Sequence, residues 1–150
     1  MGTCTFFGHR DCPESVKTEL TETLTRLITE DGFDRFLVGN HGRFDAAAYN
    51  VLCELRKIYG HITVRVVLAY MPTEQAAEKY GSDTVLPEAI ETVPKRNAII
   101  WRNKWMISQS DCVVSCITRP FGGAAQFAEL AQKEGKRIIN ISDKISGKPL

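Results

Sequence analysis

Short apolar segments alternate along the chain with longer segments in which apolar residues recur every three or four positions. The short segments, residues 3–7, 33–38, 62–69, 112–117 and 137–142, have the length and composition of buried strands. The longer segments begin near Pro13, Phe44, Arg96 and Gly123 and predict helices with one apolar face. This alternation builds a parallel sheet with helices on both faces. We therefore expect an α/β Rossmann-like three-layer sandwich with about five strands, mainly parallel.

Two segments depart from the alternation. Residues 72–95 are interrupted by Pro87 and Pro94, and we interpret them as an irregular surface excursion, a candidate flap over a site. Residues 145–150 have no pattern of their own and are expected to form a tail. The remainder is continuous enough that we predict a single domain over residues 1–150.

Composition narrows the class of protein. The chain is 43% hydrophobic and 25% charged, as in globular proteins, and no apolar run is long enough to cross a bilayer. Because the N-terminal residues also lack the pattern of a signal peptide, we expect a cytoplasmic protein with no membrane partner. The net charge of +1 supplies no overall field for a long polyanion, so nucleic acid is predicted to be an unlikely partner.

The five cysteines are interpreted as small buried hydrophobic residues, as is usual in a cytoplasmic protein. Cys112 and Cys116 are four residues apart, which on a strand separates them by about 13 Å. Since that distance is too long for two ligands of one ion, we predict no metal site.

Polar turns containing glycine follow three of the predicted strands, at residues 8–10, 39–42 and 120–123. In a parallel sheet such turns lie at one edge, where ligands bind. A glycine turn that opens a helix leaves backbone N–H groups unpaired beside the positive end of the helix dipole, and anions bind there. The candidate ligand-binding residues are Gly8, His9, Arg10, Gly39, Asn40, Gly42, Asp45, Gly122, Gly123 and Ala124.

Two of these residues have a second interpretation. His9 could donate to a sugar or phosphate, or be a loop histidine bonded to the backbone. Asp45 could bind ribose hydroxyls, or cap its helix. No Gly-Lys-Ser/Thr sequence and no Gly-x-Gly-x-x-Gly sequence is present in these turns, so ATP hydrolysis is not expected.

The reactive candidates outside the turns are Arg102, Asn103 and Glu129. Arg102 lies in a helix rich in large apolar residues, where an arginine is either a solvated charge or is held by a partner or a ligand phosphate. Trp101 and Trp105 of that helix are interpreted as core rather than as base-stacking residues. Glu129 is either an ordinary solvated carboxylate or, if it faces the edge of the sheet, a base or charge stabiliser beside a ribose.

Five segments together resemble the SLOG superfamily, named for the Smf/DprA and LOG proteins, over nearly the whole chain. These segments are F-F-G-H-R, G-N-H-G-R-F-D, residues 93–111, F-G-G-A-A-Q-F-A-E and G-K-R-I-I-N-I. Its LOG branch consists of phosphoribohydrolases that pair an arginine with a P-G-G-x-G-T-x-x-E motif. The resemblance places Arg102 and Glu129 at that catalytic pair, Asn103 at a neighbouring lysine, and Gly122 and Gly123 at the two glycines. Phe121 and Ala125–Gln126 depart from the motif.

The resemblance implies binding of a nucleotide or a nucleotide-derived ligand, which we rank first, and a homodimer. The alternative is hydrolysis of the N-glycosidic bond of a nucleoside 5′-monophosphate by Arg102 and Glu129. Single-stranded DNA binding, as in the DprA branch, and a purely protein-interacting subunit are ranked lower. No cofactor is expected.

Overall fold

The computed structural model describes residues 2–13 and 15–145. Its strands are β1 (Gly2–Gly8), β2 (Phe33–Val38), β3 (Thr63–Val67), β4 (Thr84–Val85), β5 (Cys112–Cys116) and β6 (Arg137–Asn140). The helices are α1 (Val16–Thr29), α2 (Arg43–Ile58), α3 (Glu74–Tyr80), α4 (Ala98–Ser108), α5 (Gly123–Lys133) and α6 (Ser142–Ile145). Three single 3₁₀ turns, η1 (Gly81–Asp83), η2 (Glu88–Thr92) and η3 (Lys95–Asn97), lie between α3 and α4.

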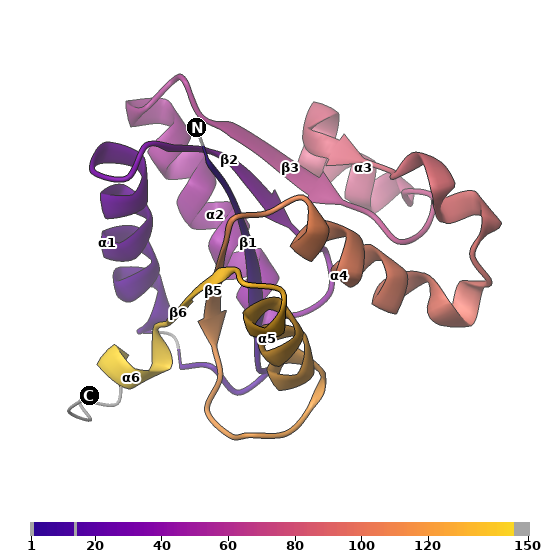
Figure 1. Cartoon of the computed structure of the whole chain (residues 1–150). Coiled ribbons are helices and arrows are strands. Elements are labelled where there is room, and N and C mark those ends of the chain that lie inside the picture. Colours follow the sequence, from indigo (N-terminus) through magenta and orange to yellow (C-terminus); the bar gives the residue numbers. More distant parts are fainter. Residues whose placement is uncertain (1, 14, 146–150) are drawn as a thin grey trace.

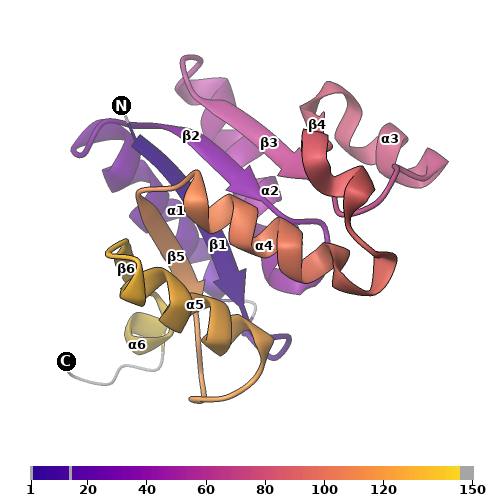
Figure 2. The ribbon, with the colours of Figure 1, turned by 45° about the vertical axis from the view of Figure 1, so that its right-hand side comes forward.

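The strands form one parallel sheet in the order β4-β3-β2-β1-β5-β6. Helices α1 and α2 cover one face of this sheet, and α4 and α5 cover the other (Figures 1 and 2). The strand order reverses between β1 and β5, because β1 pairs with β2 on one side and with β5 on the other. The predicted Rossmann-like three-layer fold is confirmed.

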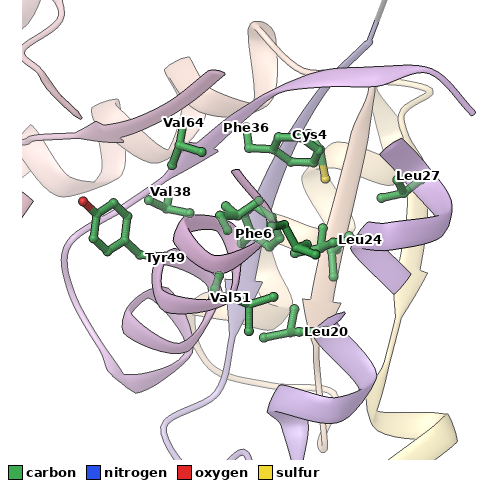
Figure 3. Packing of buried hydrophobic residues seen from close by; sticks show 14 of the residues in the cluster. Cys4, Phe6, Leu20, Leu24, Leu27, Phe36, Val38, Tyr49, Val51 and Val64 are labelled. Atoms are coloured by element: carbon green, nitrogen blue, oxygen red, sulfur yellow. The ribbon is translucent and has the colours of Figure 1, made fainter. Parts of the chain in front are cut away.

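Each face of the sheet has its own apolar core. On the α1–α2 side, Phe6, Phe36 and Val64 of the sheet belong to one cluster with Leu20 and Leu24 of α1, with Val64 at the end of the cluster away from these two leucines (Figure 3). A smaller core on the α4–α5 side joins β1, β2, β3 and β5 to residues of both helices, among them Met106, Ile107 and Ala131. Successive strand residues therefore serve opposite cores, which explains why the strands are apolar without alternation.

The structure differs from the sequence-based expectation mainly in residues 72–95. Its helix α3 agrees with the two helical turns that the sequence of residues 73–81 allows, but Thr84 and Val85 pair with Val66 and Val67 to add a sixth strand. Two residues are too few to produce a recognisable strand pattern, so the sheet was predicted one strand short. At the other end, the last strand stops at Asn140, and Ser142, predicted to end that strand, begins the short helix α6, which also includes Ile145, the first residue of the predicted tail. Residues 146–150 of that tail lie outside the described residues.

The interpretation of all five cysteines as isolated apolar residues is wrong for one pair. Cys12, in the loop after β1, forms a disulfide with Cys116, the last residue of β5, 104 positions away. The remaining cysteines are free. Within residues 2–13 and 15–145 there is no cluster of three or more His, Cys, Asp or Glu side chains placed to hold a metal. The same part of the chain contains no helix that is long and apolar enough to cross a membrane.

Candidate functional site

A small pocket of about 130 Å³ lies at the carboxyl edge of the sheet, beside the point where the strand order reverses. Four elements or their adjoining loops meet in it: β1, the turn after β2 with the first turn of α2, α4 and α5. The sequence-predicted residues in its lining are Gly8, Asp45, Arg102, Asn103 and Ala124. The three glycine turns therefore converge on one edge, as their positions after parallel strands suggested.

Arg102 is the central polar group of this pocket and is only 2% exposed. Its Nη1 donates to Asn40 Oδ1 and to the Val67 carbonyl oxygen, both at 3.0 Å. Its Nε donates to Asn103 Oδ1 at 2.8 Å, and its Nη2 lies 3.3 Å from His41 Nδ1. A guanidinium has five N–H groups, so these contacts leave one Nη2 hydrogen for a ligand. Arg102 thus ties the end of β3 and the turn after β2 to α4.

Asp45 approaches Arg102 from the opposite layer of the fold. Its Oδ2 accepts a hydrogen bond from the backbone N–H of His41 at 3.2 Å, so the carboxyl group holds the turn that opens α2. Burial raises the pKa of Asp45 to about 6, against the opposing effects of Arg102 and of that N–H group. Gly39 permits this approach, because a Cβ there would lie 2.9 Å from Asp45 Oδ2 and 3.3 Å from Arg102 Cζ.

His9 is buried and holds the loop between β5 and α5. Its Nδ1 accepts the N–H of Thr118 at 3.0 Å, so its Nε2 carries the proton and donates to the Phe121 carbonyl oxygen at 3.0 Å. His9 is therefore a loop histidine bonded to the backbone, which is the second of the two interpretations that its sequence position allowed. Arg119 of the same loop pairs with Asp11, with nitrogen–oxygen distances of 2.8 and 2.9 Å.

The far side of this loop is held by Asn140, at the end of β6. Its side chain accepts from the N–H of Ile117 at 3.0 Å and donates to the carbonyl oxygen of Ile117 at 3.2 Å. The loop that leads into α5 is therefore fixed on one side by His9, just after β1, and on the other by Asn140 of β6.

The N-termini of α2 and α5 have the same construction. The residue before each helix is a glycine in the left-handed region, Gly42 with φ 115° and ψ 165° and Gly122 with φ 99° and ψ 169°. Neither helix has a hydrogen bond from a capping side chain. The first N–H groups of both helices thus point at the same edge of the sheet without a side-chain partner.

Glu129 does not join Arg102. Its side chain is 64% exposed and pairs with Lys133 of its own helix at 3.3 Å. Phe127, two residues earlier, lines the pocket and stacks on Phe7 with ring centroids 5.5 Å apart. Two residues correspond to about 200° around a helix, so Glu129 points away from the face that lines the pocket. The structure therefore does not assemble the predicted Arg102–Glu129 pair.

The remaining candidates have varied positions. Arg10 is exposed in the loop after β1, while Trp101 and Trp105 are half-buried. His41, which the sequence did not distinguish from a surface histidine, lines the pocket and contacts Arg102. Burial and the charge of Arg102 lower the pKa of His41. The sequence signal that could have identified His41 as a site residue is its position in the second glycine turn, between Asn40 and Gly42.

Two known structures are similar to this chain, and both are of the DNA processing protein A (DprA) from bacteria. The protein from Streptococcus pneumoniae matches with a TM-score of 0.65 and 14% identity over 92% of this chain and 49% of its own. The protein from Helicobacter pylori, whose structure describes a single-stranded DNA binding mode, matches with a TM-score of 0.62 and 16% identity over 97% of this chain and 72% of its own. The chain thus spans about half the length of the S. pneumoniae protein. No protein-family model and no curated protein matches.

These similarities show that the chain shares the fold of the DprA proteins, which is the fold that the sequence resemblance implied. They also contradict the prediction that nucleic acid is an unlikely partner, since a protein of this fold binds single-stranded DNA. That prediction rested on the net charge of the whole chain. Net charge does not describe how charges are distributed over one edge of a sheet.

Proposed function

We propose that this chain binds a phosphate-bearing, nucleotide-type ligand at the carboxyl edge of its sheet. The observation that carries the proposal is the pair of glycine-capped N-termini of α2 and α5, which flank the end of β1 and lack side-chain caps. Such N-termini attract anions through unpaired N–H groups and the helix dipole. A phosphate at Gly123 and Ala124 of α5 would place the attached sugar over the pocket that Asp45, Asn103 and Arg102 line.

Binding is favoured over cleavage of the ligand. Hydrolysis of the LOG type uses a carboxylate at the position of Glu129, and this exposed residue pairs with Lys133 instead. The carboxylate that does line the pocket, Asp45, accepts the backbone N–H of His41 and so supports the turn that opens α2. Arg102 retains a single free donor after its contacts with the surrounding turns. An assay for release of free base from nucleoside 5′-monophosphates is expected to give no signal above that of protein-free buffer, and a signal that is lost in Asp45→Asn or Arg102→Ala would contradict this.

Gly123 offers a sharp test of the phosphate position. A Cβ at this residue has no neighbour within 4 Å, so a side chain fits without rearrangement. Gly123→Asp places a carboxylate at the first position of α5, where it suits the helix dipole but repels an anion. We expect thermal stability to be retained, while the melting-temperature increase that nucleoside monophosphates produce in the parent protein is lost.

The matched control is Gly123→Ala, which adds the side-chain carbon without the charge. It should keep the ligand-dependent increase in melting temperature. Equal increases in the parent protein and both variants would place the phosphate elsewhere, and no increase with any nucleotide or oligonucleotide would exclude the proposed function.

Single-stranded DNA is the second candidate ligand, favoured by the charges at this edge. The loop segments 8–13, 39–43, 68–73, 94–97 and 117–122 contain five cationic residues and one acidic residue, Asp11; the cations are Arg10, Arg43, Lys95, Arg96 and Arg119. Phe121, 65% exposed, lies against Arg119 in the same loops. The DprA protein of H. pylori, which has this fold, binds single-stranded DNA.

Salt dependence separates the two ligands. If a strand contacts several phosphates, the logarithm of its affinity falls with the logarithm of salt concentration by about 0.7 for each neutralised phosphate. We expect a slope of about 3 or more for an oligothymidylate if the edge binds a strand through four or more of these cations. A slope near 1, equal to that of the mononucleotide, would restrict the ligand to a single nucleotide.

A further inference from the structure

The pocket beside Arg102 is too small for a whole nucleotide. Its volume of about 130 Å³ suits a sugar or a phosphate, whereas sites that enclose drug-sized ligands measure roughly 300 Å³ or more. A bound nucleotide must therefore extend out of this pocket, and its base needs a second surface.

An apolar groove of about 390 Å³ lies next to the pocket. It runs between the residues that follow β3 and the segment that leads into α4. The second half of the predicted excursion at residues 72–95 therefore forms one of its walls. Its lining includes Tyr70, Met71, Ile90 and Val93, with Glu91 and Lys95 as the charged residues among those that line it. Tyr70 and Met71 are 40% and 72% exposed, so an apolar surface is accessible here without rearrangement.

One contact and one pair of consecutive residues connect the groove to the pocket. The ring of Tyr70, in the groove, meets the ring of His41, in the pocket, edge-on with centroids 6.3 Å apart. Ala98 lines the groove, while the next residue of α4, Ile99, lines the pocket. The hydroxyl group of Tyr70 donates to the carbonyl oxygen of Lys95 at 2.9 Å, which holds its ring in place.

We propose that this groove binds the aromatic base of the nucleotide-type ligand, with Tyr70 as the residue that contacts the base. The inference rests on the proposed function, since it places the base relative to a sugar in the Arg102 pocket. A flat, largely apolar base matches the lining of the groove, and tyrosine rings are common stacking partners of bases. Another large recess, between α1 and α2, carries Lys17 and Arg43 among apolar residues, and its aromatic residue, Phe44, is only 2% exposed and so offers no ring for stacking.

Titration calorimetry with two ligands tests this assignment. The parent protein should bind a nucleoside 5′-monophosphate about tenfold more tightly than ribose 5-phosphate, because base stacking contributes on the order of 1 kcal/mol or more. Tyr70→Ala should remove this difference and leave the affinity for ribose 5-phosphate unchanged. Tyr70→Phe keeps the ring and should keep most of the difference. Ile58→Ala, which trims an exposed apolar side chain at the far end of α2, should change neither affinity.

The outcomes distinguish the inference from the function on which it rests. Equal affinities of the parent protein for the two ligands would overturn the base groove but leave the phosphate site intact. A loss of nucleotide affinity in Phe121→Ala but not in Tyr70→Ala would place the base at the β5–α5 loop and overturn it as well. If the folded parent protein binds neither ligand, both the inference and the proposed mononucleotide site fail.

Discussion

At the scale of single residues, the candidate site depends on two charged groups that are held without a direct ion pair. Arg102 and Asp45 come from opposite layers and meet near Gly39, and each bonds to the turn after β2. Burial lowers the pKa of Arg102 and raises that of Asp45, so the interior disfavours both charges. An anionic ligand beside Arg102 would supply a charge partner that the protein itself does not fully provide.

Asp45 should make the stability of the protein depend on pH. Its pKa is about 6 in the folded state and 3.8 in an ordinary solvated aspartate, so the folded state binds the proton more tightly. The free energy of unfolding should therefore fall as pH rises through this window, by at most about 3 kcal/mol. Asp45→Asn should be more stable than the parent protein in urea unfolding at pH 7.5, and the difference should shrink towards pH 4. A constant difference across that range would contradict the buried carboxylate.

Arg102→Ala should lower the free energy of unfolding by about 3 kcal/mol, because it leaves buried acceptors without donors. Urea unfolding measures this loss. The matched control is Lys104→Ala on the same helix, where the side chain is exposed and the change should be within about 0.5 kcal/mol. A small effect of both substitutions would mean that the contacts of Arg102 do not stabilise the fold.

At the scale of elements, the loop after β1 and the loop after β5 act as one unit. Three residues of the first loop reach the second: His9 bonds to Thr118 and Phe121, Asp11 pairs with Arg119, and Cys12 is linked to Cys116. These contacts fix the start of α5 relative to β1. The proposed anion site is therefore set by the packing of two loops and not by either loop alone.

Reduction of the Cys12–Cys116 disulfide should destabilise the protein. A cross-link that spans 104 positions restricts the unfolded chain, and the loss is expected to be about 3–5 kcal/mol. Thermal unfolding with and without a reductant measures it. Cys12→Ala should lower the melting temperature about as much as the reductant does, and the reductant should then have little further effect. If the reductant lowers the melting temperature of both proteins equally, the stabilising disulfide is not this one.

The sequence was sufficient to predict the alternation of strands and helices and the edge of the sheet where the turns meet. Both follow from local apolar patterns and from parallel strand pairing. It was insufficient for β4, whose two residues depend on β3 for their conformation. It also could not decide which way Glu129 points, since a family motif assigns a position in the chain but not a face of a helix. The Cys12–Cys116 pair joins distant segments and required the strand order.

At the scale of the whole molecule, α4 stands out because it is apolar on more than one side. Met106 and Ile107 face the sheet, while Ile100 is 49% exposed and Trp101 and Trp105 are half-buried. The exposed positions of α4 are Ile100, Lys104 and Ser108, so a contact with a second copy would centre on Ile100 and on Trp101 beside it. The homodimer implied by the resemblance stays a prediction, and this surface is our candidate for its interface.

Sedimentation velocity tests that interface. Ile100→Asp should shift the protein towards the monomer if α4 packs against a second copy, because it would bury an unpaired charge at the contact. Lys104→Ala removes a charge from the same helix without this penalty and should leave the distribution unchanged. A parent protein that sediments as a monomer at all concentrations would rule out the dimer.

The support that Asn140 and His9 give to the loop before α5 has a consequence for the order of folding. His9 directly follows the first strand of the chain and Asn140 ends the last strand of the sheet, so the loop acquires its shape only after both of these segments have docked. A nascent or truncated chain that ends before β6 would have most of its hydrophobic core, but the loop that forms the proposed anion site at the start of α5 would not yet have its final conformation. Competence to bind should thus arise as one of the latest events of maturation.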